Sequence, residues 1–579
     1  MGNLRNEQKI NALYELWLKN ATEDSDLNKE LTKIKGNDAE ISDRFYRDLE
    51  FGTGGLRGVI GAGTNRMNIY TVRKATQGMA NYLLENAGEK SVAIAYDSRI
   101  KSDYFAKSAA SVLAANGIKV YIYKELMPTP MLSFAVRKLG CDAGIIITAS
   151  HNPSKYNGFK AYGSDGCQLT LEAASAVLEK VNALDTFDDV KTTDFEKALS
   201  SGMINYIGED VIDSYIENVK AQSIHADVVE QSGLKVVYTP LNGAGNKPVR
   251  RILNEIGIKD VVVVKEQESP DGHFPTCPYP NPEIEEALRL GLELSNKEKP
   301  DLLLATDPDC DRVGIAVPNE KGSFQLITGN ETGALLLEYI CKERIANGTM
   351  PKNPITVKTI VTTDLIKAIA KEYNVELIEV LTGFKFIGEQ IGFLEDKGEE
   401  NRYIFGFEES YGYLSGTYVR DKDAVVASML ICEMAAFYRT KGISLLQARD
   451  NIYKKYGYYC NKLSTFTCEG AAGMERMSEI MRDIRKAYPV DVAGEKVIGI
   501  ADYLTSEKTD LETGKTFDIT LPKSNVFTLY LEHNNSIIVR PSGTEPKIKV
   551  YYTATGKNSD EACALQERFA DEFTKILGF

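Results

Sequence analysis

An acidic cluster at residues 307–312 carries the most specific chemistry in this sequence. Asp307, Asp309 and Asp311 alternate with other residues directly after an apolar run. Three carboxylates this close repel one another strongly, and a divalent cation relieves that repulsion. Their hard oxygen atoms suit Mg²⁺, whereas Cys310 does not, because Mg²⁺ disfavours sulfur. The spacing therefore predicts a Mg²⁺ site, with a solvated acidic turn as the alternative.

A second candidate is Ser150, which lies in Thr-Ala-Ser-His-Asn-Pro after the apolar run 144–147. A serine at the end of a strand can project into a cleft, but it needs a base or a pre-installed group to become reactive. The Gly-x-Ser-x-Gly elbow of hydrolases is absent, since Thr148 and Asn152 occupy the glycine positions. Acyl transfer is therefore disfavoured, and a plain turn bonded to its own backbone is the alternative.

Two further loops could bind phosphate and sugar. Arg-Pro-Ser-Gly-Thr at 540–544 combines an arginine, two hydroxyls and a glycine that permits a tight turn, which suits an anion. An ordinary hairpin loop is the alternative there. Gly-Phe-Glu-Glu-Ser-Tyr-Gly at 406–412 places carboxylates beside a hydroxyl, which suits sugar hydroxyls. By itself this second segment is more simply interpreted as a charged turn.

Several basic residues accompany these loops, and each alone is typical of a solvated surface charge. They are Arg57, His151, Lys160, Lys385 and Lys422. The four histidines form no zinc pattern, and the glycines at 52–63 do not match the dinucleotide-binding fingerprint.

The elements that must position these loops follow from the hydrophobic pattern. Amphipathic segments at 169–184 and 474–488 predict helices, and the first 50 residues read as helical. Short β-branched runs between turn residues predict strands, and the alternation indicates α/β domains. The expected strands are 91–96, 119–123, 144–148, 235–239, 261–264, 301–305, 355–361, 377–380, 403–407, 527–531, 536–540 and 547–552. A final helix is expected to bury Leu565, Phe569, Phe573 and Ile576 on one face.

Composition excludes several classes of protein. Lys and Arg total 68 of 579 residues, and Asp and Glu total 82, which gives a formal net charge of −14. That balance argues against general nucleic-acid binding. The apolar run 425–437 is too short to span a bilayer and contains Glu433, so no membrane association is expected. Nine scattered cysteines without Cys-x-x-Cys indicate reduced thiols and a cytoplasmic protein.

Taken together, the four loops resemble those of the α-D-phosphohexomutase superfamily, in the same order and over nearly the whole chain. Residues 148–153 resemble its phosphoserine loop and 307–312 its metal loop. Residues 408–410 resemble its sugar-binding loop and 540–544 its phosphate-binding loop. The likeness is greatest to the phosphoglucomutase and phosphopentomutase branch, because of Ser-His-Asn-Pro-Ser-Lys-Tyr-Asn-Gly-Phe-Lys at 150–160 and the long chain.

The resemblance implies an α/β fold with three similar mixed α/β domains and a smaller C-terminal α+β lid domain around a central cleft. We expect the domain with the phosphoserine loop at 1–207 and the domain with the metal loop at 208–325. The domain with the sugar-binding loop is expected at 326–450, and the domain with the phosphate-binding loop at 451–579.

The same resemblance implies an intramolecular phosphotransferase that moves a phosphoryl group between C1 and C6 of glucose through phosphoserine and a bisphosphate. Mg²⁺ would be the cofactor, and glucose 1,6-bisphosphate the activator and intermediate. The partners would be small sugar phosphates, and the protein a monomer or a homodimer. Lys160 matches the family's general acid/base and would act near neutrality if neighbouring cations lowered its pKa.

Individual roles follow residue by residue from the resemblance. The catalytic residues would be Ser150, Lys160, His151, Arg57 and Lys422, and the metal ligands Asp307, Asp309, Asp311 and Ser150. The substrate-binding residues would be Thr382, Gly383, Lys385, Glu408, Ser410, Arg540, Ser542, Gly543, Thr544 and Arg312. Two departures from the family pattern are Cys310, where Gly or Ala is usual, and a shorter segment between Pro153 and Lys160 than in the animal enzymes.

Other functions stay open at this point. Phosphopentomutase and glucose 1,6-bisphosphate synthase activities share the same motifs, because specificity among them rests on small differences in fit. Residues 309–313 also match the Asp-x-Asp-x-Thr/Val start of a haloacid-dehalogenase-type phosphatase, with Asp309 as nucleophile, but this leaves the loops of Ser150 and Arg540 unexplained. A silent sugar-phosphate sensor is a further alternative, although every expected reactive position is occupied.

Overall fold

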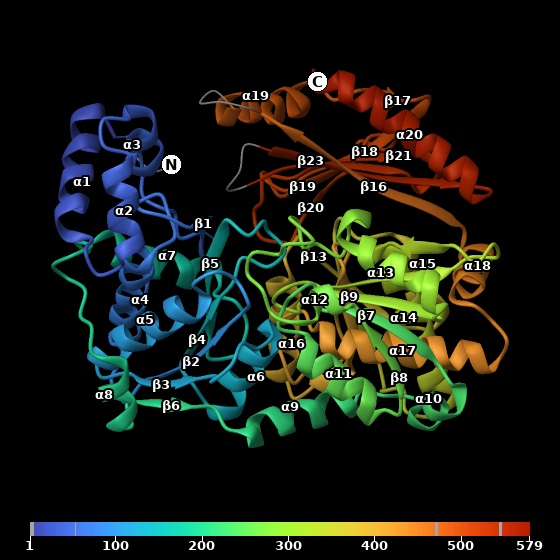
Figure 1. Cartoon of the computed structure of the whole chain (residues 1–579). Coiled ribbons are helices and arrows are strands. Elements are labelled where there is room, and N and C mark those ends of the chain that lie inside the picture. The colour runs from blue at the N-terminus through green and yellow to red at the C-terminus, as the bar shows by residue number, and fades with distance from the viewer. Residues whose placement is uncertain (1–4, 53, 469–472, 543–546) are drawn as a thin grey trace. The chain divides into compact units, whose positions relative to one another are not determined.

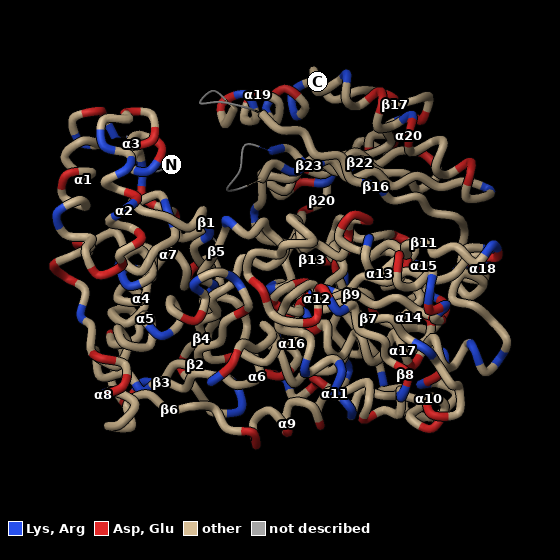
Figure 2. The backbone as a smooth tube through the Cα atoms, viewed as in Figure 1, with Lys and Arg blue, Asp and Glu red and all other residues tan. Residues whose placement is uncertain are grey.

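The structure is a computed structural model that describes residues 5–52, 54–468, 473–542 and 547–579 (Figure 1). The chain divides into two compact units. The first comprises Met1–Ile327, Gly388–Asn401 and Gly412–Lys441; the second comprises Thr328–Ile387, Arg402–Tyr411 and Gly442–Phe579. Basic and acidic residues are interspersed along the backbone of both units (Figure 2). In the described residues, no helix is both long and apolar enough to cross a membrane.

The first unit contains two mixed sheets, whose strand orders are β1-β5-β4-β2-β3-β6 and β11-β10-β9-β7-β8. The strands are β1 (Gly55–Val59), β2 (Ser91–Tyr96), β3 (Lys119–Ile122), β4 (Ala143–Ile147), β5 (Tyr156–Gly163), β6 (Ile204–Tyr206), β7 (Lys235–Thr239), β8 (Asp260–Val263), β9 (Leu302–Thr306), β10 (Val313–Pro318) and β11 (Phe324–Ile327). The helices are α1 (Glu7–Asn20), α2 (Ser25–Lys33), α3 (Asp38–Phe45), α4 (Ile69–Leu83), α5 (Ser102–Ala115), α6 (Thr129–Leu139), α7 (Leu171–Asn182), α8 (Phe195–Ser200), α9 (Glu209–Lys220), α10 (Ala226–Ser232), α11 (Asn246–Glu255), α12 (Lys265–Glu268), α13 (Glu285–Glu298) and α17 (Ala424–Thr440). Strands such as β4 are buried along their whole length, as expected of a sheet covered on both faces.

The second unit contains β12 (Ile355–Thr359), β13 (Glu376–Val380) and β14 (Tyr403–Glu408), with α14 (Gly329–Ala346), α15 (Leu365–Glu372) and α18 (Leu445–Tyr456). Its C-terminal sheet has the order β16-β23-β22-β21-β18-β19-β20 and is antiparallel throughout. Its strands are β16 (Tyr458–Thr467), β17 (Asp491–Val492), β18 (Glu495–Asp502), β19 (Glu507–Asp510), β20 (Thr516–Asp518), β21 (Phe527–Leu531), β22 (Ser536–Pro541) and β23 (Lys547–Gly556). Helices α19 (Gly473–Lys486) and α20 (Ser559–Ile576) cover one face of this sheet (Figure 1). Helix α16 (Phe384–Glu395) begins in the second unit and ends in the first. Strand β15 (Gly412–Leu414) belongs to the first unit.

A repeated strand order gives the loops equivalent positions. In β2–β3–β4, β7–β8–β9 and β12–β13–β14, the first strand lies in the middle, the second on one side and the third on the other, all parallel. Ser150 follows the third strand of the first set, the acidic cluster follows that of the second, and Glu408 ends that of the third. Ligands bind beyond the carboxyl ends of strands in such sheets. The repeated strand order therefore places these three candidate segments at equivalent strand ends.

The predicted strands are all confirmed within two residues, apart from the later end of β23, and the predicted helices correspond to α7, α19 and α20. The prediction for Ile576 was wrong: Leu565, Phe569 and Phe573 are buried, but Ile576 is 39% exposed. It is the last residue of α20, and the next residue, Leu577, is buried in its place. Sequence patterns missed β5, because asparagine and glycines interrupt its apolar pattern. The expected domain boundaries stay predictions.

Candidate active site

Ser150 lies in the loop between β4 and β5, which pair in antiparallel fashion. Its backbone adopts a left-handed conformation, with φ of 51°. A serine rarely adopts this conformation, and such strained residues concentrate at functional sites. The Ser150 hydroxyl donates a 2.8 Å hydrogen bond to Asp307 Oδ2, and its Oγ lies 3.2 Å from His151 Nδ1. The serine and the acidic cluster therefore meet, although 157 positions separate them in the chain.

Arg99, which no sequence motif singled out, binds the backbone of the serine loop. Its Nη1 donates 3.0 Å hydrogen bonds to the carbonyls of Pro153 and Tyr156, and its Nη2 donates to those of Ser150 and Asn152. The side chain is fully buried beside Asp97, whose carboxylate accepts from the Arg99 backbone N–H. A guanidinium fork can bind several carbonyls at once in a fixed geometry. The loop's conformation therefore depends on one arginine.

Asp97 links this arrangement to the sheet. It follows β2, and Thr148 follows β4; these strands are parallel neighbours, so their carboxyl ends meet at one edge. Thr148 Oγ1 donates to Asp97 at 2.6 Å and accepts from the Ser150 N–H at 2.8 Å. A chain of hydrogen bonds thus runs from Arg99 through Asp97 and Thr148 to Ser150.

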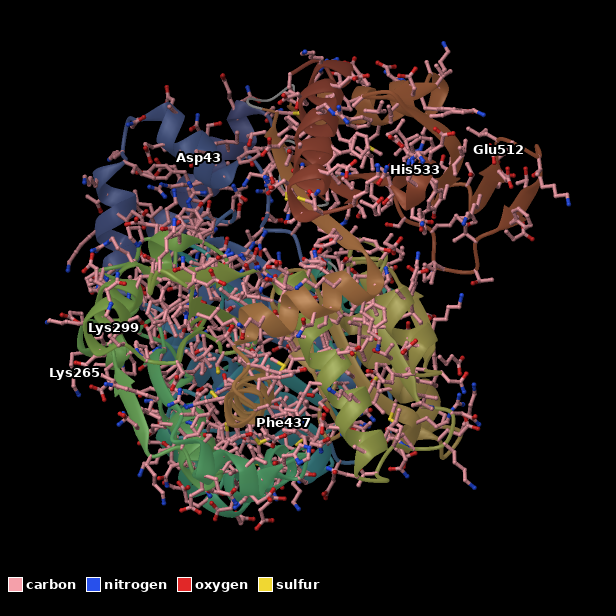
Figure 3. The ribbon with its side chains drawn as sticks, turned by 90° about the vertical axis from the view of Figure 1, so that its right-hand side faces the viewer. Asp43, Lys265, Lys299, Phe437, Glu512 and His533 are labelled. Carbon is pink, nitrogen blue, oxygen red and sulfur yellow. The ribbon has the colours of Figure 1, made fainter. Side chains whose placement is uncertain are left out.

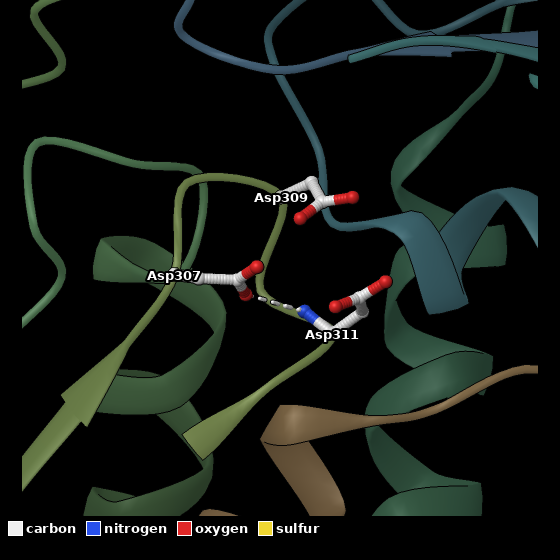
Figure 4. Close-up of side chains that lie close together, drawn as sticks. All are labelled: Asp307, Asp309 and Asp311. Atoms are coloured by element: carbon white, nitrogen blue, oxygen red, sulfur yellow. Dashed lines mark hydrogen bonds between the residues drawn. The ribbon is translucent and has the colours of Figure 1, made fainter. Parts of the chain in front are cut away.

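The acidic cluster forms the loop of the β9–β10 hairpin (Figure 4). Asp307 Oδ1 accepts from the backbone N–H groups of Asp311 and Arg312 at 3.1 and 3.0 Å, which folds the loop around it. Cys310 has a left-handed φ of 52°, which gives a physical reason why glycine suits this position. The three side chains converge, and one oxygen of each carboxylate lies within 4.8 Å of the others.

The donor set fits a hard divalent cation. All three carboxylates are fully buried. Among the described residues, Asp309 Oδ1 and Asp311 Oδ1 are buried and make no hydrogen bond. A buried polar atom without a partner is costly, and a cation bound between these oxygens would satisfy both. The three aspartates could therefore hold a metal ion.

Two lysines neutralise part of this charge. Lys160 Nζ lies 2.9 Å from Asp309 Oδ2 and 3.5 Å from Asp311 Oδ2. Lys422 Nζ lies 3.2 Å from the same Asp311 oxygen. Thr129, which the sequence analysis also missed, donates to Asp309 Oδ2 at 2.9 Å. Together with Ser150, these side chains come from four separate segments and converge on the hairpin loop.

The pKa values follow from burial and charge. Burial, followed by repulsion from Asp309 and Asp311, raises the pKa of Asp307 well above its usual range. Burial opposes ionisation of Asp309 too, but the Lys160 charge, together with hydrogen bonds from Asp307, Lys160 and Thr129, lowers the pKa of Asp309 overall. For Lys160, burial lowers the pKa, yet Asp309 and Asp311 raise it overall. The condition under which Lys160 would act near neutrality, a pKa lowered by neighbouring cations, is not met here, because its nearest neighbours are anions.

Three further expected residues lie around this centre. In the pairing of β1 with β5, Arg57 is opposite Gly158 and Gly55 is opposite Lys160, so Arg57 and Lys160 share one face of the sheet. Burial, with the Arg312 charge second, lowers the pKa of His151 well below its usual range, so its ring is neutral at neutral pH. Arg312 itself forms a 2.6 Å ion pair with Glu283.

The second unit assembles the expected sugar-binding residues. The Gly383 N–H donates to Glu408 Oε1 at 2.9 Å, which joins the loop after β13 to the end of β14. Thr382 Oγ1 is buried without a hydrogen-bond partner among the described residues. Lys385 lies over the Phe386 ring, and Ser410 follows Glu408 in the same loop region. Glu408 and Thr382 thus present polar groups at one edge of this sheet.

Tyr551 connects these residues to the expected phosphate-binding loop. Burial, followed by the Glu409 charge, raises the pKa of Tyr551 overall, although the charge of Arg540 and a hydrogen bond with it oppose the rise. Arg540 lies on β22, and the Ser542 N–H donates a 2.7 Å hydrogen bond to the Lys547 carbonyl. The expected residues Gly543 and Thr544 lie outside the described residues. Sequence alone offered no signal for Tyr551, which lies in an ordinary strand pattern.

Comparison with known proteins agrees with this arrangement. Four domain models described as phosphoglucomutase/phosphomannomutase match the chain in order. The alpha/beta/alpha domains I, II and III match residues 48–187, 213–322 and 328–456, and the C-terminal domain matches 525–572.

Curated relatives and solved structures show the same likeness. Proteins named phosphoglucomutase from Staphylococcus saprophyticus and Staphylococcus aureus are 39% and 38% identical over 547 and 553 residues. These alignments cover 94% of this chain in both cases, and 97% and 96% of the relatives. Parafusin, a phosphoglucomutase from Paramecium solved in an open form, gives a TM-score of 0.68 at 18% identity, covering 92% of this chain and 95% of its own. A phosphoglucomutase/phosphomannomutase family protein from Burkholderia thailandensis gives 0.64 at 19% identity, covering 91% and 96%. At these identities the structures support the fold alone.

Proposed function

The chain belongs to the phosphoglucomutase/phosphomannomutase family of the α-D-phosphohexomutase superfamily, and on that premise we propose that it is a phosphoglucomutase. It moves a phosphoryl group between C1 and C6 of glucose through a phosphoserine and a bisphosphate. The observation that carries the proposal is the 2.8 Å hydrogen bond from Ser150 to the buried acidic cluster. The names of the Staphylococcus relatives support glucose phosphates as substrates.

Ser150 is the proposed phosphoryl acceptor. Its proton has two acceptors within reach, Asp307 Oδ2 at 2.8 Å and His151 Nδ1 at 3.2 Å. His151 is suited to this because burial keeps its ring neutral. The Ser150 Oγ–P bond forms as the bond from phosphorus to the sugar oxygen breaks, and the reverse step returns the group to a sugar hydroxyl. Phosphoryl transfer depends mainly on such positioning and on charge stabilisation.

Lys160 is the proposed general acid for the leaving sugar oxygen. Its carboxylate neighbours hold it protonated, so its Nζ carries a proton to donate. It accepts a proton back from the sugar hydroxyl in the reverse step. Positioned acid–base groups contribute about 10²–10⁴-fold in rate. Arg57, Arg312 and Lys422 supply further positive charge for the transferring phosphoryl group.

We propose Mg²⁺ for the acidic cluster, with Asp307, Asp309, Asp311 and Ser150 as its ligands. A divalent cation bound there draws negative charge away from the transferring group. In the second unit, Glu408, Ser410, Thr382, Gly383 and Lys385 are proposed to bind the sugar, and Arg540, Ser542, Gly543 and Thr544 the non-reacting phosphate. Glucose 1,6-bisphosphate is the proposed intermediate and activator. A cytoplasmic location is also part of the proposal, since all nine cysteines are free.

The test compares turnover of glucose 1-phosphate, mannose 1-phosphate and ribose 1-phosphate, with Mg²⁺ and glucose 1,6-bisphosphate. The proposal expects the highest kcat/KM for glucose 1-phosphate and one phosphate group on Ser150 by mass spectrometry. A preference for ribose 1-phosphate would indicate a phosphopentomutase. Phosphate release from any of them, unaffected by Ser150→Ala but lost in Asp309→Asn, would indicate a phosphatase instead.

A further inference from the structure

Two of the nine cysteines lie against each other in the second unit. The Sγ atoms of Cys460, on β16, and Cys563, on α20, are 2.8 Å apart, although 103 positions separate them in the chain. Cys460 is buried at 7% exposure, and Cys563 is more accessible. Neither cysteine is among the residues of the candidate active site, so this pair has no part in the proposed phosphoryl transfer.

The fold fixes this proximity through the end of β23. Cys460 pairs with Ala554 on β23, two residues before Gly556, the last residue of that strand. A Cβ atom on Gly556 would lie 2.5 Å from the Ala562 backbone nitrogen, so only glycine allows the first turn of α20 to pack this closely. Cys563 directly follows Ala562. Because the first turn of α20 packs closely against the end of β23, the Cys563 side chain lies beside Cys460 on the neighbouring strand β16.

We propose that Cys460 and Cys563 form a redox-modification site, in which a peroxide or a low-molecular-weight disulfide converts the two thiols into one intramolecular disulfide. A disulfide bond is about 2.05 Å long, so the sulfurs need to approach by less than ~1 Å. The two thiols are flanked by a strand and a helix that already pack together. The reaction therefore requires only a small local adjustment.

The more accessible Cys563 reacts first. With a low-molecular-weight disulfide, the Cys563 sulfur forms a mixed disulfide and releases one small thiol, and the Cys460 sulfur then displaces the second small thiol. With hydrogen peroxide, the Cys563 sulfur attacks the O–O bond, which gives a sulfenic acid and one molecule of water. The Cys460 sulfur then attacks that sulfur, the S–S bond forms, and a second water leaves with the thiol proton. Two thiols have lost two electrons and two protons, and one peroxide has become two waters. Burial, and next the neighbouring Cys563, raise the pKa of Cys460 to about 12, which agrees with its role as the second thiol.

The disulfide would close a loop that contains most of the C-terminal sheet. Cross-links of long loops stabilise a fold, because they restrict the unfolded chain. Reversible disulfides in cytoplasmic proteins act as redox sensors. The site would thus couple the stability of this part of the second unit to the thiol oxidation state.

The experiment treats the reduced, purified full chain with hydrogen peroxide or oxidised glutathione, followed by alkylation in denaturant and peptide mass mapping. The expected result is a cross-linked peptide pair containing Cys460 and Cys563, lighter by two hydrogen atoms and restored by dithiothreitol. Non-reducing gels should show a monomer-sized band. The oxidised chain should melt at least ~5 °C higher than the reduced chain.

Variants separate this pair from the other thiols. Cys563→Ser and Cys460→Ser should each abolish the cross-linked peptide and the rise in melting temperature. Cys468→Ser, which changes a buried cysteine outside the pair, should retain both. The proposal is overturned if both thiols stay fully alkylatable at oxidant doses that modify other cysteines, or if Cys563 forms only a mixed disulfide with glutathione. These readouts do not involve turnover, so they succeed or fail independently of the proposed function.

Discussion

The hydroxyl of Ser150 donates a 2.8 Å hydrogen bond to the Asp307 carboxylate, so the ends of two separate strands, β4 and β9, supply one reactive centre. Both residues follow the third strand of a repeated three-strand order. The Ser150 hydroxyl and the acidic cluster both lie in loops whose ends are anchored by neighbouring strands, so the sheets set where these side chains meet.

Replacement of Ser150 by alanine should lower kcat by at least ~10³-fold, because it removes the nucleophile. Intact-protein mass spectrometry should then show no phosphate after incubation with glucose 1,6-bisphosphate. Ser154→Ala in the same loop is the matched control and should retain activity and phosphate. Substantial turnover by Ser150→Ala would contradict the assignment.

Asp311→Asn should weaken divalent-cation binding roughly 10–100-fold, because it removes one charge from the cluster. Titration of activity with Mg²⁺, and of binding with Mn²⁺ by electron paramagnetic resonance, measures the shift. Asp260→Asn changes an exposed aspartate on β8 and should leave both titrations unchanged. An unaltered Mn²⁺ titration in Asp311→Asn would place the metal elsewhere.

Arg99→Lys should lower kcat by ~10²-fold with little change in KM, because a lysine cannot bind four carbonyls and Ser150 is then misplaced. The buried charge network is also weakened, so the melting temperature should fall. Arg73→Lys, which alters a fork paired with the exposed Glu23, serves as the control and should have a minor effect. If kcat is retained while only stability drops, Arg99 has no positioning role.

Glu408→Gln should raise KM for glucose 1-phosphate about tenfold, because one charged acceptor for sugar hydroxyls is lost. The amide oxygen can still accept from the Gly383 N–H, so the loop should keep its place. Phosphate on Ser150 should persist in this variant. Its loss, with KM unchanged, would assign Glu408 to the transfer step.

A buried lysine should make the second unit sensitive to pH. Lys358 is fully buried and lies 3.0 and 2.9 Å from Asp364 and Glu379. Burial tends to raise the pKa of both acids, but Lys358 and Lys367 lower it overall. Since the pKa of each acid is lower when folded than the unfolded values near 4, this stabilisation is present above about pH 4 and is lost as the pH falls through the folded values.

Lys358→Met should therefore destabilise the protein by about 3 kcal/mol at pH 7, because it leaves two carboxylates without their buried partner. The loss should shrink towards pH 4, because in the variant the two buried carboxylates lack this cation, burial raises their pKa, and they take up protons. Urea denaturation at both pH values measures it. Lys367→Met removes a half-exposed partner of the same acids and should cost less. An equal loss at both pH values would contradict the linkage.

The sequence by itself predicted many of the strands, several helices and the positions of the candidate site. Strand patterns, the spacing of Asp307, Asp309 and Asp311, and the place of Ser150 after an apolar run are local properties, readable within a few residues. Their resemblance to known loops added the expected roles of Lys160 and Arg540. Strand β5, which contains asparagine and glycine, was not predicted, because the stability of such a strand comes from packing against its neighbours.

Only the tertiary structure decided which distant groups meet. Arg99, Thr129, Tyr551 and the pair of Cys460 and Cys563 lie in ordinary patterns, and their partners are tens to hundreds of positions away. The direction of the Lys160 pKa depended on its nearest charges, which proved to be carboxylates. Contacts across such separations depend on how whole sheets and helices pack, and electrostatic energies depend on distance and burial. Neither quantity is encoded in local spacing.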